Sequence, residues 1–181
     1  MDFIAGAVGM TAIAGLQVAL YEGEYGSVLL TRRPILSVTR HDLSISRREP
    51  RSALDVELDV AGVRTRVILT HLGLGLFERR QQIRRILRVV SATPGIEPVI
   101  LLGDINEWLP RGGPLRWLHA EFGAPPAPRS FPARFPFLAL DRIWVRPRKA
   151  LLSVAAHRSH RARTASDHLP IKAVVSVRPR D

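Results

Sequence analysis

Cysteine is absent from the 181 residues of this chain, and lysine occurs only at Lys149 and Lys172. The lack of cysteine excludes a disulfide scaffold, a thiol nucleophile and a zinc site with cysteine ligands. Any metal must therefore be held by Asp, Glu, His or asparagine side chains. Asn106 is the only asparagine in the sequence.

The net charge is strongly positive, +11 at pH 7, with 27 Lys and Arg against 16 Asp and Glu. A basic surface favours polyanions such as nucleic acid, nucleotides or anionic lipid headgroups. The arginines are spread over all segments, and no aromatic platform for stacking bases is evident. The charge therefore supports a phosphate-containing partner without identifying it.

Length and composition predict a single domain over residues 1–181, because 46% hydrophobic and 24% charged residues are typical of globular proteins. Phe3–Leu20 carries no charge and reaches the lower length limit of a membrane span. It is rich in Gly and Ala, however, and follows Asp2 instead of a basic start. We expect a buried helix through Ile13, a strand to Tyr21 and a cytoplasmic protein, with a span or signal peptide as the alternative.

The apolar pattern predicts strands, then a helix, then strands again. Leu54–Val60 and Val63–Thr70 alternate around the turn Ala61-Gly62, which predicts a hairpin with one solvated face. Leu76–Val90 has the period of an amphipathic helix. This order indicates a mixed α/β (α+β) fold more than a regular βαβ alternation. Further strands are expected at 26–32, 35–41, 99–102, 138–145, 151–157 and 171–177, with a turn at 22–26 and a short helix at 115–122.

Four polar stretches follow apolar strands, where a rigid sheet can present side chains to a cleft. Alone, each has a plainer interpretation as an Asx turn, a surface turn or a hydrogen-bonded structural histidine. The stretches are Thr70-His71-Leu72-Gly73, Gly103-Asp104-Ile105-Asn106, Leu140-Asp141-Arg142-Ile143 and Ser166-Asp167-His168.

The residue types in these stretches suit phosphate chemistry. Asp104 and Asn106 point to the same side of an extended backbone, and a carboxylate beside an amide suits a hard cation and a phosphate oxygen. Asp167 is a metal-capable carboxylate next to His168. A histidine acts as general base once a carboxylate fixes its orientation, and Asp141 is the candidate for that role.

Together the four stretches resemble the endonuclease/exonuclease/phosphatase superfamily, the metal-dependent phosphoesterases related to DNase I. The resemblance runs from about residue 20 to the C-terminus. It implies a DNase I-like four-layer α/β sandwich of two mixed sheets. The other matching pieces are Tyr25-Gly26 through Ile35, Glu78 to Gln82, Val99 to Leu102, Ser130-Phe131-Pro132-Ala133 and Leu169-Pro170.

The resemblance implies a metal and phosphate centre. In the family, the residue that matches Asp104 orients the attacking water or contacts the metal. The match to Asn106 binds phosphate or metal, and the match to Asp167 helps to hold the divalent ion, Mg²⁺ or Mn²⁺.

It also implies two histidine roles. The match to His168 is the general base or a phosphate contact, paired with the match to Asp141. The match to His71 donates a hydrogen bond to the scissile phosphate or protonates the leaving group. In DNase I-like members this histidine is supported by a glutamate, for which Glu24 is the match in this sequence.

The sequence departs from the family pattern near its start. Family members begin with a strand that ends in Asn, then a helix, then a strand that ends in Gln-Glu, whose glutamate is the principal metal ligand. No Gln-Glu pair occurs here. We therefore expect a form that lacks the first strands, and weak metal binding, because hard cations need several oxygen ligands.

Three functions remain open. The first is a Mg²⁺-dependent phosphoesterase acting on nucleic acid, phospholipid headgroups or inositol phosphates. The second is an inactive truncated relative that binds phosphate or nucleic acid, and the third is a basic nucleic-acid-binding protein without catalysis. Residues 157–163 are basic and either meet a phosphate backbone or form a solvated loop, which is the interpretation we favour.

Overall fold

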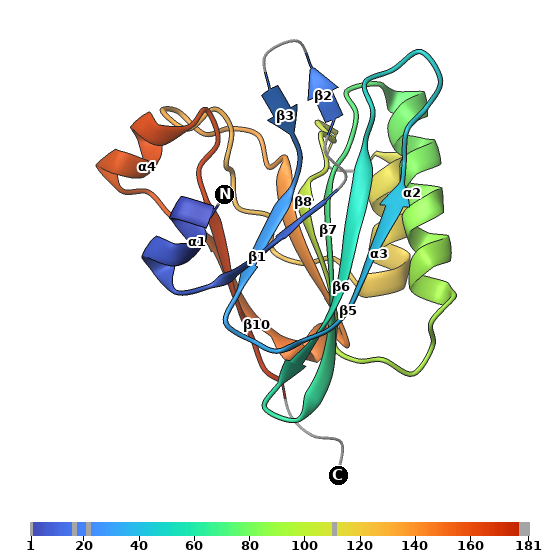
Figure 1. Cartoon of the computed structure of the whole chain (residues 1–181). Helices are drawn as coiled ribbons and strands as arrows, with labels where there is room; N and C mark the ends of the chain where they lie inside the picture. The colour runs from blue at the N-terminus through green and yellow to red at the C-terminus, as the bar shows by residue number, and fades with distance from the viewer. Residues whose placement is uncertain (1, 16–17, 21–22, 110–111, 178–181) are drawn as a thin grey trace.

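A five-stranded mixed sheet forms the centre of the protein (Figure 1). In this computed structural model, residues 2–15, 18–20, 23–109 and 112–177 are described. The strand order is β5-β6-β7-β8-β9, in which β7 and β8 are parallel and the other neighbours antiparallel. The strands are β5 (Ile35–Asp42), β6 (Ser52–Val60), β7 (Val63–His71), β8 (Val99–Asp104) and β9 (Asp141–Arg146).

The predicted hairpin is confirmed as β6 and β7. Ala61 and Gly62 both have positive φ angles, 55° and 82°, which a two-residue hairpin turn requires, and the Gly62 amide donates to Asp59 Oδ1 at 2.7 Å. The prediction of one solvated face was wrong. Residues 53–58 are all buried, because both faces of this part of the sheet are covered.

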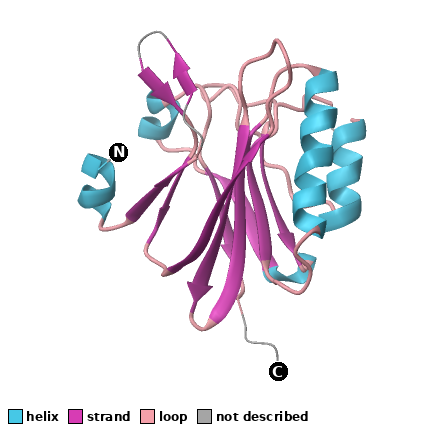
Figure 2. Cartoon of the chain, turned by 45° about the vertical axis from the view of Figure 1, so that its right-hand side comes forward, coloured by secondary structure: helices cyan, strands magenta, loops and turns pink. Residues whose placement is uncertain are grey.

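Two helices cover one face of the sheet (Figure 2). They are α2 (Leu76–Ser91) and α3 (Gly113–Phe122), near their predicted positions. The side chains that alternate along β7, β8 and β9 divide between the two faces of the sheet. On the helix side, Ile68, Leu101 and Trp144 are fully buried against the apolar faces of both helices.

Two antiparallel strand pairs cover the opposite face. Val67 packs against the pair of β1 (Thr11–Ala14) and β4 (Val28–Thr31). Val145 packs against the pair of β10 (Leu151–Ala156) and β11 (Ile171–Val175). The α/β sandwich predicted by the family resemblance is confirmed, and within the described residues its second layer consists of these separate pairs.

The N-terminal prediction was wrong in part. Helix α1 ends at Val8, because Gly9 adopts the left-handed conformation that terminates helices. The helix (Asp2–Val8) is also largely exposed and not buried. Of the strand predicted to Tyr21, Val18–Leu20 forms β2, whereas Gly15 is not part of a strand, and residues 16–17 and Tyr21 lie outside the described residues. No helix in the described part of the chain combines the length and apolar character needed to cross a membrane.

Three other segments differ from prediction. The predicted turn at 22–26 includes a strand, β3 (Gly23–Tyr25), which pairs with β2. The strand expected from Leu138 begins at Asp141. Part of the basic segment 157–163 is helical, because Ser159 caps α4 (His160–Ala165) by accepting from the Ala162 amide at 3.1 Å. The remaining helix is the 3₁₀ turn η1 (Arg148–Ala150).

We predict that Ile86→Ala lowers the free energy of unfolding by about 2–5 kcal/mol, because Ile86 is buried between α2 and the sheet and its truncation leaves a cavity. Urea unfolding monitored by circular dichroism measures this. The matched control is Leu152→Ala, whose side chain is 62% exposed and whose loss should cost about 0.5 kcal/mol or less. Equal losses in the two variants would contradict the packing described here.

Candidate active site

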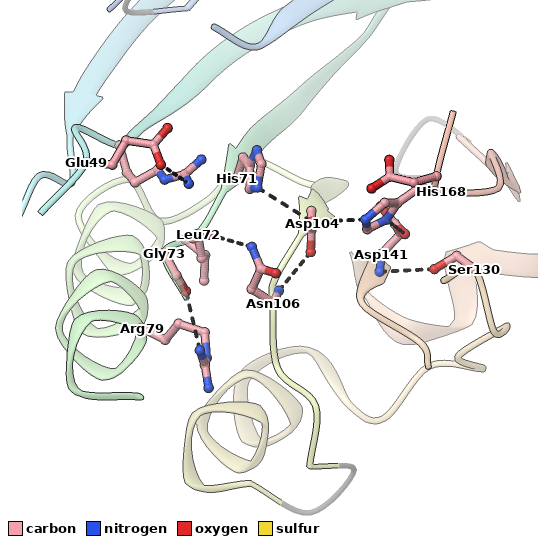
Figure 3. Close-up of polar contacts among 12 residues, drawn as sticks. Glu49, His71, Leu72, Gly73, Arg79, Asp104, Asn106, Ser130, Asp141 and His168 are labelled. Atoms are coloured by element: carbon pink, nitrogen blue, oxygen red, sulfur yellow. Dashed lines mark hydrogen bonds and ion pairs between the residues drawn. The ribbon is translucent and has the colours of Figure 1, made fainter. Parts of the chain in front are cut away.

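Three neighbouring strand ends place chemically useful side chains side by side. His71 lies opposite Asp104 in the parallel pair β7–β8, and Asp104 lies opposite Asp141 in the antiparallel pair β8–β9. Residues directly opposite each other point to the same face of a sheet. The three side chains therefore form a row at one end of the central sheet, as Figure 3 shows.

Gly103 allows β7 and β8 to approach closely just before this row. Its φ angle is 141°, and a Cβ atom at this position would lie 1.7 Å from the carbonyl oxygen of Thr70. Any side chain would push the strands apart next to Asp104 and His71. The glycine in the Gly-Asp-x-Asn stretch is thus required by sterics.

His168 completes the row from a separate segment. Its Nδ1 lies 2.8 Å from Asp141 Oδ2, and its Nε2 lies 3.9 Å from Asp104 Oδ2 (Figure 3). The His168 amide donates to Ser166 Oγ at 3.1 Å, and the Phe131 ring packs 4.8 Å from the imidazole. The ring is therefore oriented by a carboxylate, a turn and an aromatic neighbour.

The environment of His168 favours its protonated form. Burial alone would lower the pKa of the imidazole, but the hydrogen bond to Asp141 and the charges of Asp141, Asp104 and Asp167 together raise it above its ordinary value. A carboxylate on Nδ1 stabilises the imidazolium that forms when Nε2 accepts a proton. This arrangement suits a general base.

Asp104 and His71 influence each other at the centre of the row. His71 Nε2 lies 3.5 Å from Asp104 Oδ2, and the His71 side chain is half exposed. Burial raises the pKa of Asp104 against the opposing effects of the Asn106 amide and the histidines. Burial and the nearby Arg51 guanidinium lower the pKa of His71 in spite of Asp104. Since its pKa is lowered, His71 is the more readily neutral histidine of the two.

Asn106 ties the loops after β7 and β8 together. It has a positive φ of 52°, so its amide N–H donates to Asp104 Oδ1 at 2.8 Å. Its side-chain Nδ2 donates to the Leu72 carbonyl at 2.8 Å, and the residue is buried. The Asx turn is therefore present, and it lies beside the site, where it fixes one oxygen of Asp104.

A buried polar layer based on α2 supports these loops, and its members were not predicted to be functional. Gln82 Oε1 accepts from the Gly73 amide at 2.9 Å. The Arg79 guanidinium donates to the Leu74 carbonyl and lies 3.5 Å from Glu107, whose carboxylate is 2% exposed. The available signal was the occurrence of Arg79 and Gln82 on the inner face of an otherwise amphipathic helix.

The remaining predicted site residues lie outside the row. Asp167 is exposed; its carbonyl accepts from the Ala133 amide at 2.7 Å, and its charge contributes to the raised pKa of His168. Glu24 lies in β3 opposite Ala19, and its side chain is outside the described part of the structure.

The donor set fits a divalent cation. Ligand atoms of Asp104, Asp141 and His168 all lie within 4.8 Å of one another. Two carboxylates supply the oxygen ligands that hard cations prefer, and Asp167 adds a third negative charge nearby. One carboxylate, Asp141, is already engaged by His168 Nδ1, so Asp104 is the most available ligand of the three.

We predict that Asp141→Asn lowers the pKa of His168, because the neutral amide removes the charge that stabilises the imidazolium. Titration of the histidine ring protons by NMR measures it. Asp59→Asn, at the far end of β6, is the matched control and should leave His168 unchanged. Since folding raises the pKa of His168, its protonation stabilises the fold below the unfolded pKa near 6.5, and this contribution is lost as pH rises through the folded pKa. A His168 pKa that is the same in wild type and Asp141→Asn would contradict the pairing.

The comparisons with known proteins agree with this geometry. Residues 6–168 match the model of the endonuclease/exonuclease/phosphatase family. The chain is 30% identical over 183 aligned residues to the uncharacterized protein YbhP of Escherichia coli K12, covering 96% of this chain and 72% of YbhP.

Solved structures share the fold. An endonuclease/exonuclease/phosphatase from Bacteroides vulgatus superposes with a TM-score of 0.78 at 20% identity, covering 98% of this chain and 80% of that one. A mannosyl-6-phosphatase from Bacteroides thetaiotaomicron superposes with a TM-score of 0.70 at 16% identity, covering 92% of this chain and 77% of that one. The family match spans most of the chain and includes all four polar stretches, so the chain belongs to the endonuclease/exonuclease/phosphatase family, whose members are hydrolases that act on phosphoesters.

Proposed function

We propose that this protein is a divalent-metal-dependent phosphoesterase that hydrolyses phosphodiester or phosphomonoester bonds. The observation that carries the proposal is the convergence of two imidazoles and two carboxylates from four separate segments: His71, Asp104, Asp141 and His168. Phosphoryl transfer needs positioning of a nucleophile, neutralisation of the phosphate oxygens and help for the leaving oxygen. This set of side chains supplies candidates for each need.

In the proposed reaction His168 activates the water. Asp141 engages Nδ1, which leaves Nε2 to accept a proton. The 3.9 Å between His168 Nε2 and Asp104 Oδ2 is too long for a direct hydrogen bond and can be bridged by one water molecule held by both groups. As the water oxygen bonds to phosphorus, its proton passes to Nε2 and the bond from phosphorus to the leaving oxygen breaks.

His71 is proposed to act on the phosphate. It lies on the other side of Asp104 from His168, and its side chain is half exposed, so it can reach a bound ester. As a neutral imidazole, which its lowered pKa favours, it donates a ring N–H hydrogen bond to a phosphate oxygen; when protonated, it gives a proton to the departing alkoxide. Asn106 is proposed to contribute mainly by fixing Asp104, with its amide oxygen as a phosphate or metal contact.

A Mg²⁺ or Mn²⁺ ion would be held by Asp104, with Asn106, Asp141 and Asp167 as further ligands or neighbouring charges. When bound, the ion neutralises phosphate oxygens and makes water a better nucleophile. The preference for Mg²⁺ or Mn²⁺ follows from the oxygen-rich donor set. Glu24 is proposed as the support of His71.

We predict that Asp104→Ala and His168→Ala each lower kcat for bis(4-nitrophenyl) phosphate in Mg²⁺ by about 100-fold or more, as expected when a group that positions or deprotonates the nucleophile is removed. His157→Ala is the matched control, because His157 is an exposed histidine that directly follows β10 and is not part of the row. The assay is release of 4-nitrophenolate. Full activity in both active-site variants would refute the assignment.

We also predict that EDTA abolishes this activity and that Mg²⁺ or Mn²⁺ restores it. Calorimetric titration of the metal-free protein should show weak binding, with a Kd on the order of 1 mM, because few oxygen ligands converge. Asp104→Asn should weaken binding further, whereas Asp42→Asn, on an exposed strand end, should not. Activity that persists in EDTA would exclude a metal-dependent reaction.

A second candidate is phosphate binding without turnover. It is favoured by the few free carboxylate oxygens in the row, since Asp141 is engaged by His168 and one oxygen of Asp104 accepts from the Asn106 amide. The two candidates differ in one result: a protein that binds inorganic phosphate through His71 and His168 but hydrolyses no ester in Mg²⁺ or Mn²⁺ is a binding module.

A further inference from the structure

Large apolar side chains are exposed on three segments at the active-site end of the sheet. Their exposed fractions are far above those of a packed core. They are Leu74 (70%), Phe77 (77%), Trp108 (59%), Leu109 (63%), Phe135 (81%) and Phe137 (62%). These six residues are named the apolar rim.

The rim lies at the same end of the sheet as the row of site residues, because each of its three segments adjoins one strand end. Leu74 and Phe77 follow His71, in the segment that begins α2, whose N-terminal end lies at the top of Figure 1. Trp108 and Leu109 follow Asp104. The third loop runs into β9, and the Ala133 amide donates to the Asp167 carbonyl at 2.7 Å, which attaches this loop to the segment of His168.

The distribution of exposed aromatic residues is uneven. Five Phe or Trp side chains in the described part of the chain are more than half exposed, and four of them belong to the rim; the other is Phe3 in α1. Large apolar side chains exposed together at one end of a protein cost solubility and mark a surface that contacts something apolar. The rim side chains are not needed to hold the row of site residues in place, because buried polar groups already support the loops beside it.

Exposed arginines flank the rim. Arg134 precedes Phe135 in the third loop, and Arg47 and Arg48 are exposed in the loop 43–51, which lies at the same end of the molecule (Figure 1). The chain as a whole carries +11. Aromatic and aliphatic side chains beside cationic ones are the composition of surfaces that insert shallowly into anionic bilayers.

We propose that the apolar rim docks on an anionic lipid bilayer and that the substrates of this site are phosphoesters in lipid headgroups. The substrate assignment rests on the proposed function, whereas the docking surface does not. Rim side chains enter the boundary between headgroups and acyl chains, and the arginines pair with headgroup phosphates. This brings a headgroup ester to the row of His71, Asp104 and His168 without removing the lipid from the membrane.

A lipid surface explains the rim better than a nucleic-acid strand does. Sequence-independent binding of single strands uses a track of aromatic side chains on which bases stack. Leu74 and Leu109 offer no face for stacking, but they add apolar area that a bilayer buries. Trp108 suits the interface because its ring joins an apolar body to a polar N–H, and the Phe side chains add apolar area that inserts below the headgroups.

Co-sedimentation with vesicles made of two parts phosphatidylcholine and one part phosphatidylglycerol tests the docking surface. The wild-type protein should bind, and the double variant Phe77→Ser/Phe135→Ser should lose at least about tenfold in apparent affinity. Both side chains are exposed, so thermal unfolding should be unchanged. The matched control is Leu152→Ser/Val174→Ser, which removes two apolar side chains of β10 and β11 that are also more than half exposed, and which should bind like wild type.

Three results would overturn the proposal: no binding of the wild type to these vesicles, equal loss in the rim and control variants, or a rim variant that keeps vesicle binding but loses affinity for a fluorescent single-stranded oligonucleotide. Because vesicle binding needs no turnover, its failure is distinguishable from failure of the phosphoesterase assay.

The substrate assignment is tested by hydrolysis of the headgroup phosphoesters in these vesicles, which Asp104→Ala should abolish. A protein that hydrolyses bis(4-nitrophenyl) phosphate but leaves the vesicle lipids intact would overturn the substrate assignment.

Discussion

The register of three neighbouring strands is the constraint on which the site depends. Backbone hydrogen bonds between β7, β8 and β9 set His71, Asp104 and Asp141 level with one another, although the three lie far apart in the sequence. A shift of one residue in either pairing would turn a side chain of the row to the other face of the sheet. Gly103 protects this register, since no larger residue fits between the strands just before Asp104. The relative positions of these three residues are thus set by the backbone pairing of the strands.

The side chains behind the row turn this register into a rigid frame. Asn106 fixes one oxygen of Asp104 and holds the Leu72 carbonyl, and Gln82 holds the Gly73 amide. Buried polar groups are costly when unpaired, so each of these contacts is also a condition for stable packing. The same interactions that keep the loops folded therefore determine where the oxygens of Asp104 point.

The sequence was sufficient to predict the fold class, the long helix and the principal members of the row, because these depend on period, turn residues and four motifs at strand ends. It was insufficient for the N-terminal segment as far as Tyr25, where short strands pair with partners that periodicity does not reveal. The sequence also did not indicate that both faces of β6 are buried, because Asp55 and Glu57 are residue types typical of a solvated face. In the structure they are paired with Arg66 and Arg64. The ion pair of Arg79 with Glu107 was not predicted, because the place of Arg79 on the inner face of the helix was the one available signal and did not indicate its partner.

The segment after β7, Leu72 to Leu74, is held by three hydrogen bonds to its backbone. Leu72 is held through its carbonyl and Gly73 through its amide, and Arg79 returns from the helix to the Leu74 carbonyl; all three contacts use backbone atoms of the segment. The side chain of Leu74 takes no part in them and extends into solvent. A substitution of the Leu74 side chain therefore changes the surface at this end of the sheet while the backbone contacts that hold the segment stay the same.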